Sequence, residues 1–203
     1  MSLLIEQKMS SYKLVPWSED LDLTEFYAEA GRRGFTNNES QFAMVERIQR
    51  EREWATWILY HDGKAVGSAG AHSLDCLPYA YRICTRTCVF TDQLTGPYGN
   101  ALRTKRVITE HQNPTAQFFI PACIEWAGRD KDLYITTNAS EVASQRRVND
   151  IFAPLLEKTG VLTLEHVMEY RGHLQNFWKL NVSLFLEQLE QVPSWTNRPG
   201  YAR

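Results

Sequence analysis

The sequence predicts an α+β fold, in which a mixed, mostly antiparallel sheet is flanked by helices on both faces. Two hairpin patterns carry this prediction, one around Asp62-Gly63 and one around Arg171-Gly172. Both central positions of a tight type I′ turn require positive φ, which an Asp-Gly pair adopts readily. The third observation is that apolar stripes with helical spacing alternate with strand-like runs along the chain.

The composition indicates one folded domain without a membrane span. Of 203 residues, 43% belong to the AVILMFWYC set and 23% are charged, which is enough apolar material for a core. We expect a single domain over residues 1–192 and a surface or loose tail over residues 193–203. No apolar run approaches the roughly 20 residues that a spanning helix needs, and the first residues lack a signal-peptide pattern. We therefore expect a cytoplasmic protein whose four cysteines are reduced thiols.

The charge balance argues against a nucleic-acid partner. The chain has 22 basic and 24 acidic residues, for a formal net charge of -2, whereas a non-specific nucleic-acid binder is normally basic. The sequence contains no HExxH pattern, Walker loop or dinucleotide-binding glycine pattern. The assembly state stays open, with a homodimer as one alternative.

The expected elements run β, α, α, β, β, β, α, β, α, β, β, with a short helix before the tail. We place the strands at residues 11–17, 54–60, 64–74, 81–90, 133–137, 161–170 and 174–182. We place the helices at residues 21–30, 38–51, 114–127, 140–159 and 184–191. Helix 114–127 has the clearest period, since its apolar residues are Ala116, Phe119, Ile120, Cys123, Ile124 and Ala127. Pro121 lies inside it and should kink the helix or mark its real start.

Two of the strands carry side chains that bear on function. Strand 64–74 places small residues on one face, which would let a helix or a ligand approach closely: Ala65, Gly67, Ala69, Ala71 and Ser73. In strand 81–90, strict alternation puts Arg82 and Arg86 on the same face as Cys84 and Cys88. Two guanidinium groups on an interior strand either pair with protein carboxylates or line a cleft that receives an acidic acceptor.

This pattern resembles the GCN5-related N-acetyltransferase (GNAT) family over residues 11–182. Residues 60–67 (YHDGKAVG) are similar to the family's second and third strands with their turn. Strand 81–90, a glycine-containing loop and a long helix follow in the order in which the family binds acyl-coenzyme A. Residues 133–138 resemble the fifth strand, whose final asparagine, here Asn138, many members place against the cofactor.

The resemblance implies an acyl-CoA-dependent N-acyltransferase that moves an acetyl group from acetyl-CoA to a primary amine of a small molecule or peptide. No metal is needed. A backbone amide of strand 81–90 would polarise the thioester carbonyl. The implied cofactor-binding residues are Cys88, Val89, Gln93, Gly96, Gly99, Arg103, Arg106 and Asn138. The alternatives stay open: residues 96–100 form a simple turn beside a solvated basic face, and Asn138 caps a helix.

The sequence departs from the family pattern both in the loop after strand 81–90 and in the predicted helix 140–159. Residues 93–98 (QLTGPY) keep the first two positions of the pyrophosphate loop, but Tyr98 occupies the third, where the family has a small residue. Gln145 occupies the position where the family often has a tyrosine that acts as a general acid. A second hypothesis is therefore a non-catalytic module of GNAT shape that binds a ligand or a protein. An unrelated α+β fold with the same element order is a third.

Two residues are the candidates for proton transfer. The reference pKa of histidine is near 6.5, so His72 could take a proton from an ammonium acceptor. Tyr170 is the candidate acid that protonates the leaving thiolate. The alternative for His72 is a purely structural role in its strand. Arg82 and Arg86 are the candidates for binding the acceptor.

Overall fold

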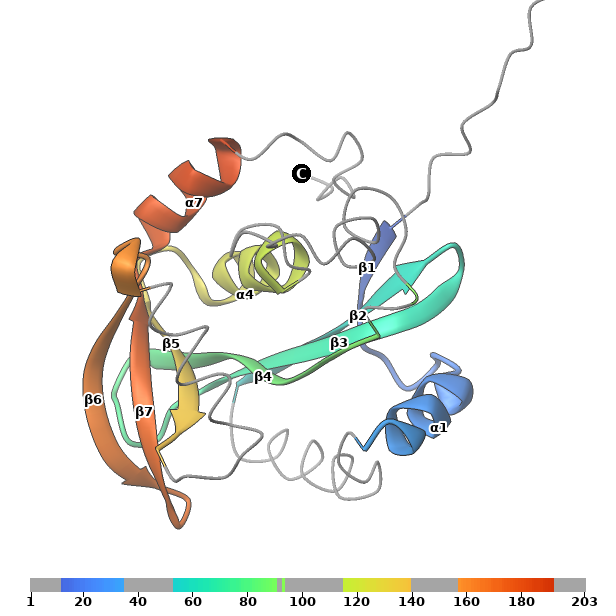
Figure 1. The fold of residues 1–203 in the computed structure, drawn as a ribbon, viewed down its shortest axis with the longest axis horizontal. Helices are drawn as coiled ribbons and strands as arrows, with labels where there is room; N and C mark the ends of the chain where they lie inside the picture. The colour runs from blue at the N-terminus through green and yellow to red at the C-terminus, as the bar shows by residue number, and fades with distance from the viewer. Residues whose placement is uncertain (1–11, 35–52, 91–92, 94–114, 140–156, 192–203) are drawn as a thin grey trace, which may run out of the picture.

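The computed structural model describes residues 12–34, 53–90, 93, 115–139 and 157–191, except for the side chains of Arg86 and Gln191 (Figure 1). The strands are β1 (Tyr12–Pro16), β2 (Trp54–His61), β3 (Lys64–Ser73), β4 (Ala80–Val89), β5 (Asp132–Asn138), β6 (Leu162–Tyr170) and β7 (His173–Leu180). The helices are α1 (Thr24–Arg32), a π-helical turn (Thr115–Phe119), α4 (Ile120–Ala127) and α7 (Val182–Gln191). The expected helices at 38–51 and 140–159 and the tail 193–203 lie outside the described residues.

The strands form a seven-stranded sheet with the order β1-β2-β3-β4-β5-β7-β6. The pair β4–β5 is parallel, and the other neighbouring strands are antiparallel. Helix α1 covers one face, and helices α4 and α7 cover the other (Figure 1). The α+β fold with a mixed, mostly antiparallel sheet and helices on both faces is confirmed.

Both predicted hairpins are present, and their turn residues have the required backbone. Asp62 and Gly63 have φ of 47° and 81°. Arg171 and Gly172 have φ of 54° and 76°. Positive φ at both central positions matches the right-handed twist of the flanking strands, so each turn brings its strands into register.

The predicted helical stripe forms the centre of the larger core. Its residues Ala116, Phe119, Ile120, Cys123 and Ile124 are buried, and Ala127 packs against them. Pro121 lies in the first turn of α4, directly after the π-helical turn. The chain is π-helical up to Phe119 and α-helical from Ile120. Of the two predicted roles, Pro121 therefore marks the start of the regular α-helix.

The face prediction for the small-residue strand is wrong at Ala65. Leu59 pairs with Gly67, but the next residue, Tyr60, pairs with Ala65, so Val66 is an extra residue on β3. Such a bulge shifts the alternation by one residue. As a result Val66 packs with Ala69 and Ala71 on the α4 side, whereas Ala65 packs on the α1 side.

Replacement of Gly63 by alanine tests the turn geometry. An alanine at φ of 81° is strained, although nothing lies within 4 Å of the added Cβ. We expect Gly63→Ala to lower the free energy of unfolding by about 1 kcal/mol, measured as a lower urea midpoint. The neighbouring exposed residue supplies the control, Lys64→Ala. An unchanged midpoint for Gly63→Ala would contradict the turn.

Candidate functional site

The two central parallel strands separate along their length. Pairing between β4 and β5 covers Ala80–Asp132, Tyr81–Leu133 and Arg82–Tyr134. Beyond these pairs, β4 stays with β3 as far as Val89, while β5 stays with β7 as far as Asn138. Figure 1 shows β5, β7 and β6 turned away from the plane of β2, β3 and β4. We call the space between residues 83–89 and 135–138 the β4–β5 opening.

Beyond their three residue pairs, the facing edges of β4 and β5 do not pair with each other. Backbone N–H and C=O groups are strong hydrogen-bonding groups that need protein, ligand or water to satisfy them. Within the described part of the chain, no strand lies between β4 and β5. The opening is therefore suited to an extended ligand that carries its own amide groups.

Strand β4 is irregular where it leaves β5. On β3 one residue separates Gly70 from His72, but two residues separate their β4 partners, Thr85 and Arg82. The same two-against-one count recurs between Thr85 and Cys88. Two bulges therefore re-aim the side chains and amides of β4 beside the opening.

The first bulge contains a residue in an unusual conformation. Cys84 has a φ of 54°, a region that few residues other than glycine adopt. The Thr87 hydroxyl donates a hydrogen bond of 2.9 Å to the carbonyl of Cys84, which spans the stretch between the two bulges. The distortion of β4 is thus held in place by a contact within the strand itself.

The bulges also correct the prediction that Cys84 and Cys88 share a face. Cys84 packs against the α4-side core, while Cys88 lies among the residues under α1. The second bulge falls between them and reverses the alternation. The hydrogen bond between Cys84 and Cys123, together with burial, holds the pKa of Cys84 well above its usual range. Burial raises the pKa of Cys88 to about 12, so both thiols are neutral at pH 7.

His72 and Arg82 lie opposite each other on β3 and β4, next to the point where the opening begins. His72 is buried, and its Nδ1 lies 2.8 Å from the carbonyl oxygen of Ser73. Since a carbonyl can only accept, Nδ1 carries the proton and Nε2 is the basic nitrogen of the neutral ring. The catalytic role of His72 stays a prediction.

Directly paired residues extend this contact into a row across the sheet. His72 faces Arg82, Arg82 faces Tyr134 on β5, and Tyr134 faces Lys179 on β7. Residues directly opposite in a sheet project from the same face. We call these four residues the polar row, and it crosses the sheet where the β4–β5 pairing ends.

Carboxylates anchor the far end of the polar row. The Tyr134 hydroxyl donates to the Glu165 carboxylate, and burial together with that bond raises the pKa of Tyr134. Lys179 Nζ lies 2.9 Å from Asp132 and 3.6 Å from Glu165, and the Asp132 contact raises the pKa of Lys179. Sequence reasoning missed this cluster because its members come from three strands, and only the register shows them together.

Tyr170 lies farther from the opening. It is buried at the end of β6, edge-on to Phe177 with ring centroids 5.8 Å apart, and the Arg171 guanidinium lies 5.3 Å from its ring centre. Strands β5 and β7 separate β6 from β4. The structure therefore brings His72 together with Arg82, and it places Tyr170 on the other side of the opening.

The predicted cofactor residues that the structure describes lie near the ends of the separating strands. Val89 ends β4, and Asn138 ends β5, where it pairs with Gln175. Gln93 is exposed, and its N–H donates to the Phe90 carbonyl at 3.0 Å. Gly96, Gly99, Arg103 and Arg106 lie outside the described residues, as does the side chain of Arg86.

Comparison with known proteins finds similarity only among solved structures. No family model and no curated protein sequence matches the chain. A protein from Desulfovibrio desulfuricans assigned to the GNAT family of acetyltransferases matches with 13% identity and a TM-score of 0.48, over 85% of this chain and 99% of that one. An acyl-CoA N-acyltransferase from Pseudomonas aeruginosa gives 12% and 0.46, over 84% and 99%. An N-acetyltransferase from Campylobacter jejuni, solved with acetyl coenzyme A, gives 11% and 0.43, over 83% and 99%.

The chain is similar in fold to GNAT acetyltransferases. This is a similarity of chain path, and at 11–13% identity it gives no residue of this chain a role. Among the described residues, no three His, Cys, Asp or Glu side chains gather in a way that could hold a metal ion. None of the described helices is long and apolar enough to cross a membrane.

The buried Cys88 thiol predicts an alkaline loss of stability. An unfolded cysteine ionises near pH 8.5, whereas the folded one keeps its proton until about 12. The stability that the buried neutral Cys88 thiol contributes is thus complete below pH 8.5. As the pH rises toward 12, the free energy of unfolding falls by up to about 1.4 kcal/mol per pH unit. Denaturant unfolding across pH 8 to 11 should show a shallower decline for Cys88→Ala than for the wild type.

The exposed cysteine provides the matched control. Cys76→Ala removes a thiol from the surface and should leave the alkaline slope as in the wild type. Equal slopes for Cys88→Ala and the wild type would contradict the burial of the Cys88 thiol.

Proposed function

We propose that the protein is an acyl-CoA-dependent N-acyltransferase that transfers an acetyl group from acetyl-CoA to a primary amine. The β4–β5 opening is the observation that carries this proposal. Parallel strands that part after three residue pairs leave backbone hydrogen-bonding groups on the facing edges of both strands. The sequence resemblance to GNAT proteins and the fold similarity point to the same activity.

The chemistry of coenzyme A fits the β4–β5 opening. Its pantetheine arm is an extended chain with two amide groups, which can pair with strand edges much as an added strand does. Such pairing would satisfy backbone groups that β4 and β5 do not offer each other. The bulges of β4 would aim an amide at the thioester carbonyl, where it stabilises the negative charge that develops in the transition state.

The phosphate end of coenzyme A would then lie beyond Val89 and Asn138, toward the loop after β4. In this proposal Asn138 binds the pantetheine arm, and Gly96 and Gly99 supply backbone amides to the pyrophosphate. Arg103 and Arg106 add positive charge. Cys88, Val89 and Gln93 contribute through the backbone at the end of β4 and just after it.

The reaction needs no covalent enzyme intermediate. A neutral amine attacks the thioester carbonyl, the N–C bond forms, and the C–S bond breaks as the tetrahedral intermediate collapses. His72 Nε2 accepts the proton that the amine loses, and the thiolate is protonated to give coenzyme A. Tyr170 is the proposed acid for that second step. Holding both substrates in one site lowers the entropic part of the barrier.

The polar row suggests the class of acceptor. A guanidinium pairs with carboxylate or phosphate in a fixed geometry, so Arg82 would favour an amine that also carries an anionic group. Arg86 joins it in this proposal. An amino acid or a small acidic metabolite amine meets this description.

The second candidate, a non-catalytic module that binds a ligand or a protein, rests on Tyr98. A bulky side chain at that loop position would hinder close approach of the phosphates. Binding without turnover would favour this candidate over the enzyme.

A thermal-shift titration with acetyl-CoA tests the proposal. At about 100 times its dissociation constant a ligand adds roughly 2.7 kcal/mol of stability, which raises the melting temperature by about 2–4 °C or slightly more for a domain of this size. Asn138→Ala should weaken the shift, and Glu190→Ala on the exposed side of α7 should not. No shift with any acyl-CoA at millimolar concentration would sink both the transferase and its cofactor site.

Release of coenzyme A thiol in the presence of amines then separates the two candidates. The transferase releases thiol with an acidic amine, and the non-catalytic module binds acetyl-CoA without amine-dependent release. Arg82→Ala should reduce acceptor use far more than it lowers the denaturant midpoint. A loss of stability on the order of 3–5 kcal/mol in Arg82→Ala would instead show that Arg82 serves a buried ion pair.

A further inference from the structure

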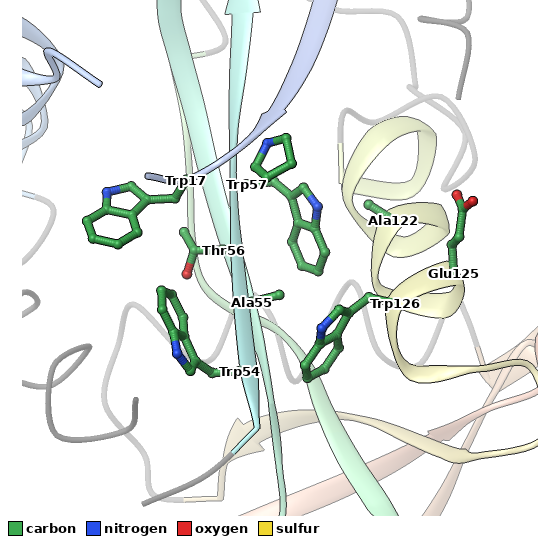
Figure 2. Close-up of a pocket in the computed structure, with 9 residues that line it drawn as sticks. Trp17, Trp54, Ala55, Thr56, Trp57, Ala122, Glu125 and Trp126 are labelled. Atoms are coloured by element: carbon green, nitrogen blue, oxygen red, sulfur yellow. The ribbon is translucent and has the colours of Figure 1, made fainter. Parts of the chain in front are cut away.

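A cleft lies near the end of the sheet that is opposite to β6, where β2 meets the end of β1 and helix α4. It encloses about 460 Å³ and is open to solvent. Its lining is dominated by tryptophan: Pro16, Trp17, Trp54, Ala55, Thr56, Trp57, Ala122, Glu125 and Trp126. We call it the tryptophan cleft (Figure 2). It has no part in the proposed transfer reaction.

The end of β1 creates this cleft. The last pair between β1 and β2 joins Pro16 to Trp57, and the Trp17 N–H then donates to the Thr56 carbonyl at 2.8 Å. The first residues of β2 extend past this point, so their side chains are not covered by β1. A sheet edge with large aromatic side chains on both faces results.

The four indole rings form two pairs, one on each side of β2 (Figure 2). Trp17 and Trp54 lie with ring centroids 5.7 Å apart and ring planes at 60°. Trp57 and Trp126 lie on the α4 side, 6.3 Å apart and at 79°. Indole faces that border a cleft attract organic ammonium groups, because the ring faces carry negative charge density.

The charged lining residue that the structure describes has the complementary sign. Among the described lining residues none is basic, and Glu125 is the acidic one. Its carboxylate points away from the rings in Figure 2, so it contributes at the rim and not by contact. Glu53, next to Trp54, accepts a 2.7 Å hydrogen bond from Tyr81, whose ring lies edge-on to Trp126 at 5.4 Å. A second carboxylate is thus held close to the cleft.

We propose that the tryptophan cleft binds a small organic cation, with an ammonium head group against the indole faces and the carboxylates of Glu53 and Glu125 at the rim. Two strands, β3 and β4, separate β2 from the β4–β5 opening, a distance of roughly 10 Å at the usual strand spacing. The cleft is therefore a site separate from that of acyl-CoA. This inference does not depend on the proposed function, and its test contains no acyl-CoA.

A pair of nearly isosteric ligands isolates the positive charge. Choline and 3,3-dimethylbutan-1-ol differ in having nitrogen or carbon at the branched centre, so they match in shape and differ in charge. Titrations followed by tryptophan fluorescence should give binding of choline about tenfold tighter than of the neutral alcohol. Equal affinities, or no binding of either at millimolar concentration, would overturn the proposal.

The chain contains its own control for location. Trp178 is buried, and its indole N–H donates to Thr137 at 3.0 Å, away from the cleft. In NMR spectra choline should shift the indole N–H signals of the four cleft tryptophans and leave that of Trp178 in place. Shifts confined to other tryptophans, or equal shifts at Trp178, would place the cation elsewhere and overturn the assignment.

A charge-neutral substitution tests the rim. Glu125→Gln keeps the side-chain size and should weaken choline binding about two- to threefold, because the carboxylate acts across solvent. The matched change on α7, Glu190→Gln, should have no effect. Unchanged choline affinity in Glu125→Gln, or equal weakening in both variants, would contradict a local effect of the Glu125 charge.

Discussion

The arrangement of the sheet depends on strand β4, which does not stay paired with both β3 and β5 along its whole length. Strand β4 follows β3 along its whole length, but it carries two residues more than β3 between their paired positions. The extra residues make bulges, which bend and twist the strand. After three residue pairs β4 can no longer follow β5, which instead stays with β7. The separation of the two halves of the sheet is thus a consequence of register.

That separation arranges the rest of the candidate site. The opening leaves strand edges that a ligand with amide groups can pair with, and its narrow end is crossed by the polar row of His72, Arg82, Tyr134 and Lys179. The carboxylates of Asp132 and Glu165 hold the β5–β7–β6 end of that row. In the proposed transferase, the opening would hold the acyl donor next to this row of polar side chains.

Local signals in the sequence predicted the parts of the fold that local chemistry decides. The Asp62-Gly63 turn and the stripe ending at Ala127 were predictable because turn φ angles and helical period depend on neighbouring residues. Bulges depend on which residue of the next strand is opposite, and no short sequence pattern states that. For this reason alternation failed at Ala65 and between Cys84 and Cys88. The polar row and the tryptophan cleft were missed for the same reason, since their members meet only through register and packing.

Hydrogen exchange tests the central claim that the β4–β5 opening is the slot for acyl-CoA. In the free protein, amides of residues 83–89 and 135–138 that face the opening should exchange quickly, because none of the described strands pairs with them there. Saturating acetyl-CoA should slow these amides and leave the hairpin of β6 and β7 unchanged. Identical exchange at both segments with and without acetyl-CoA, in a sample whose melting temperature rises with the ligand, would contradict the account.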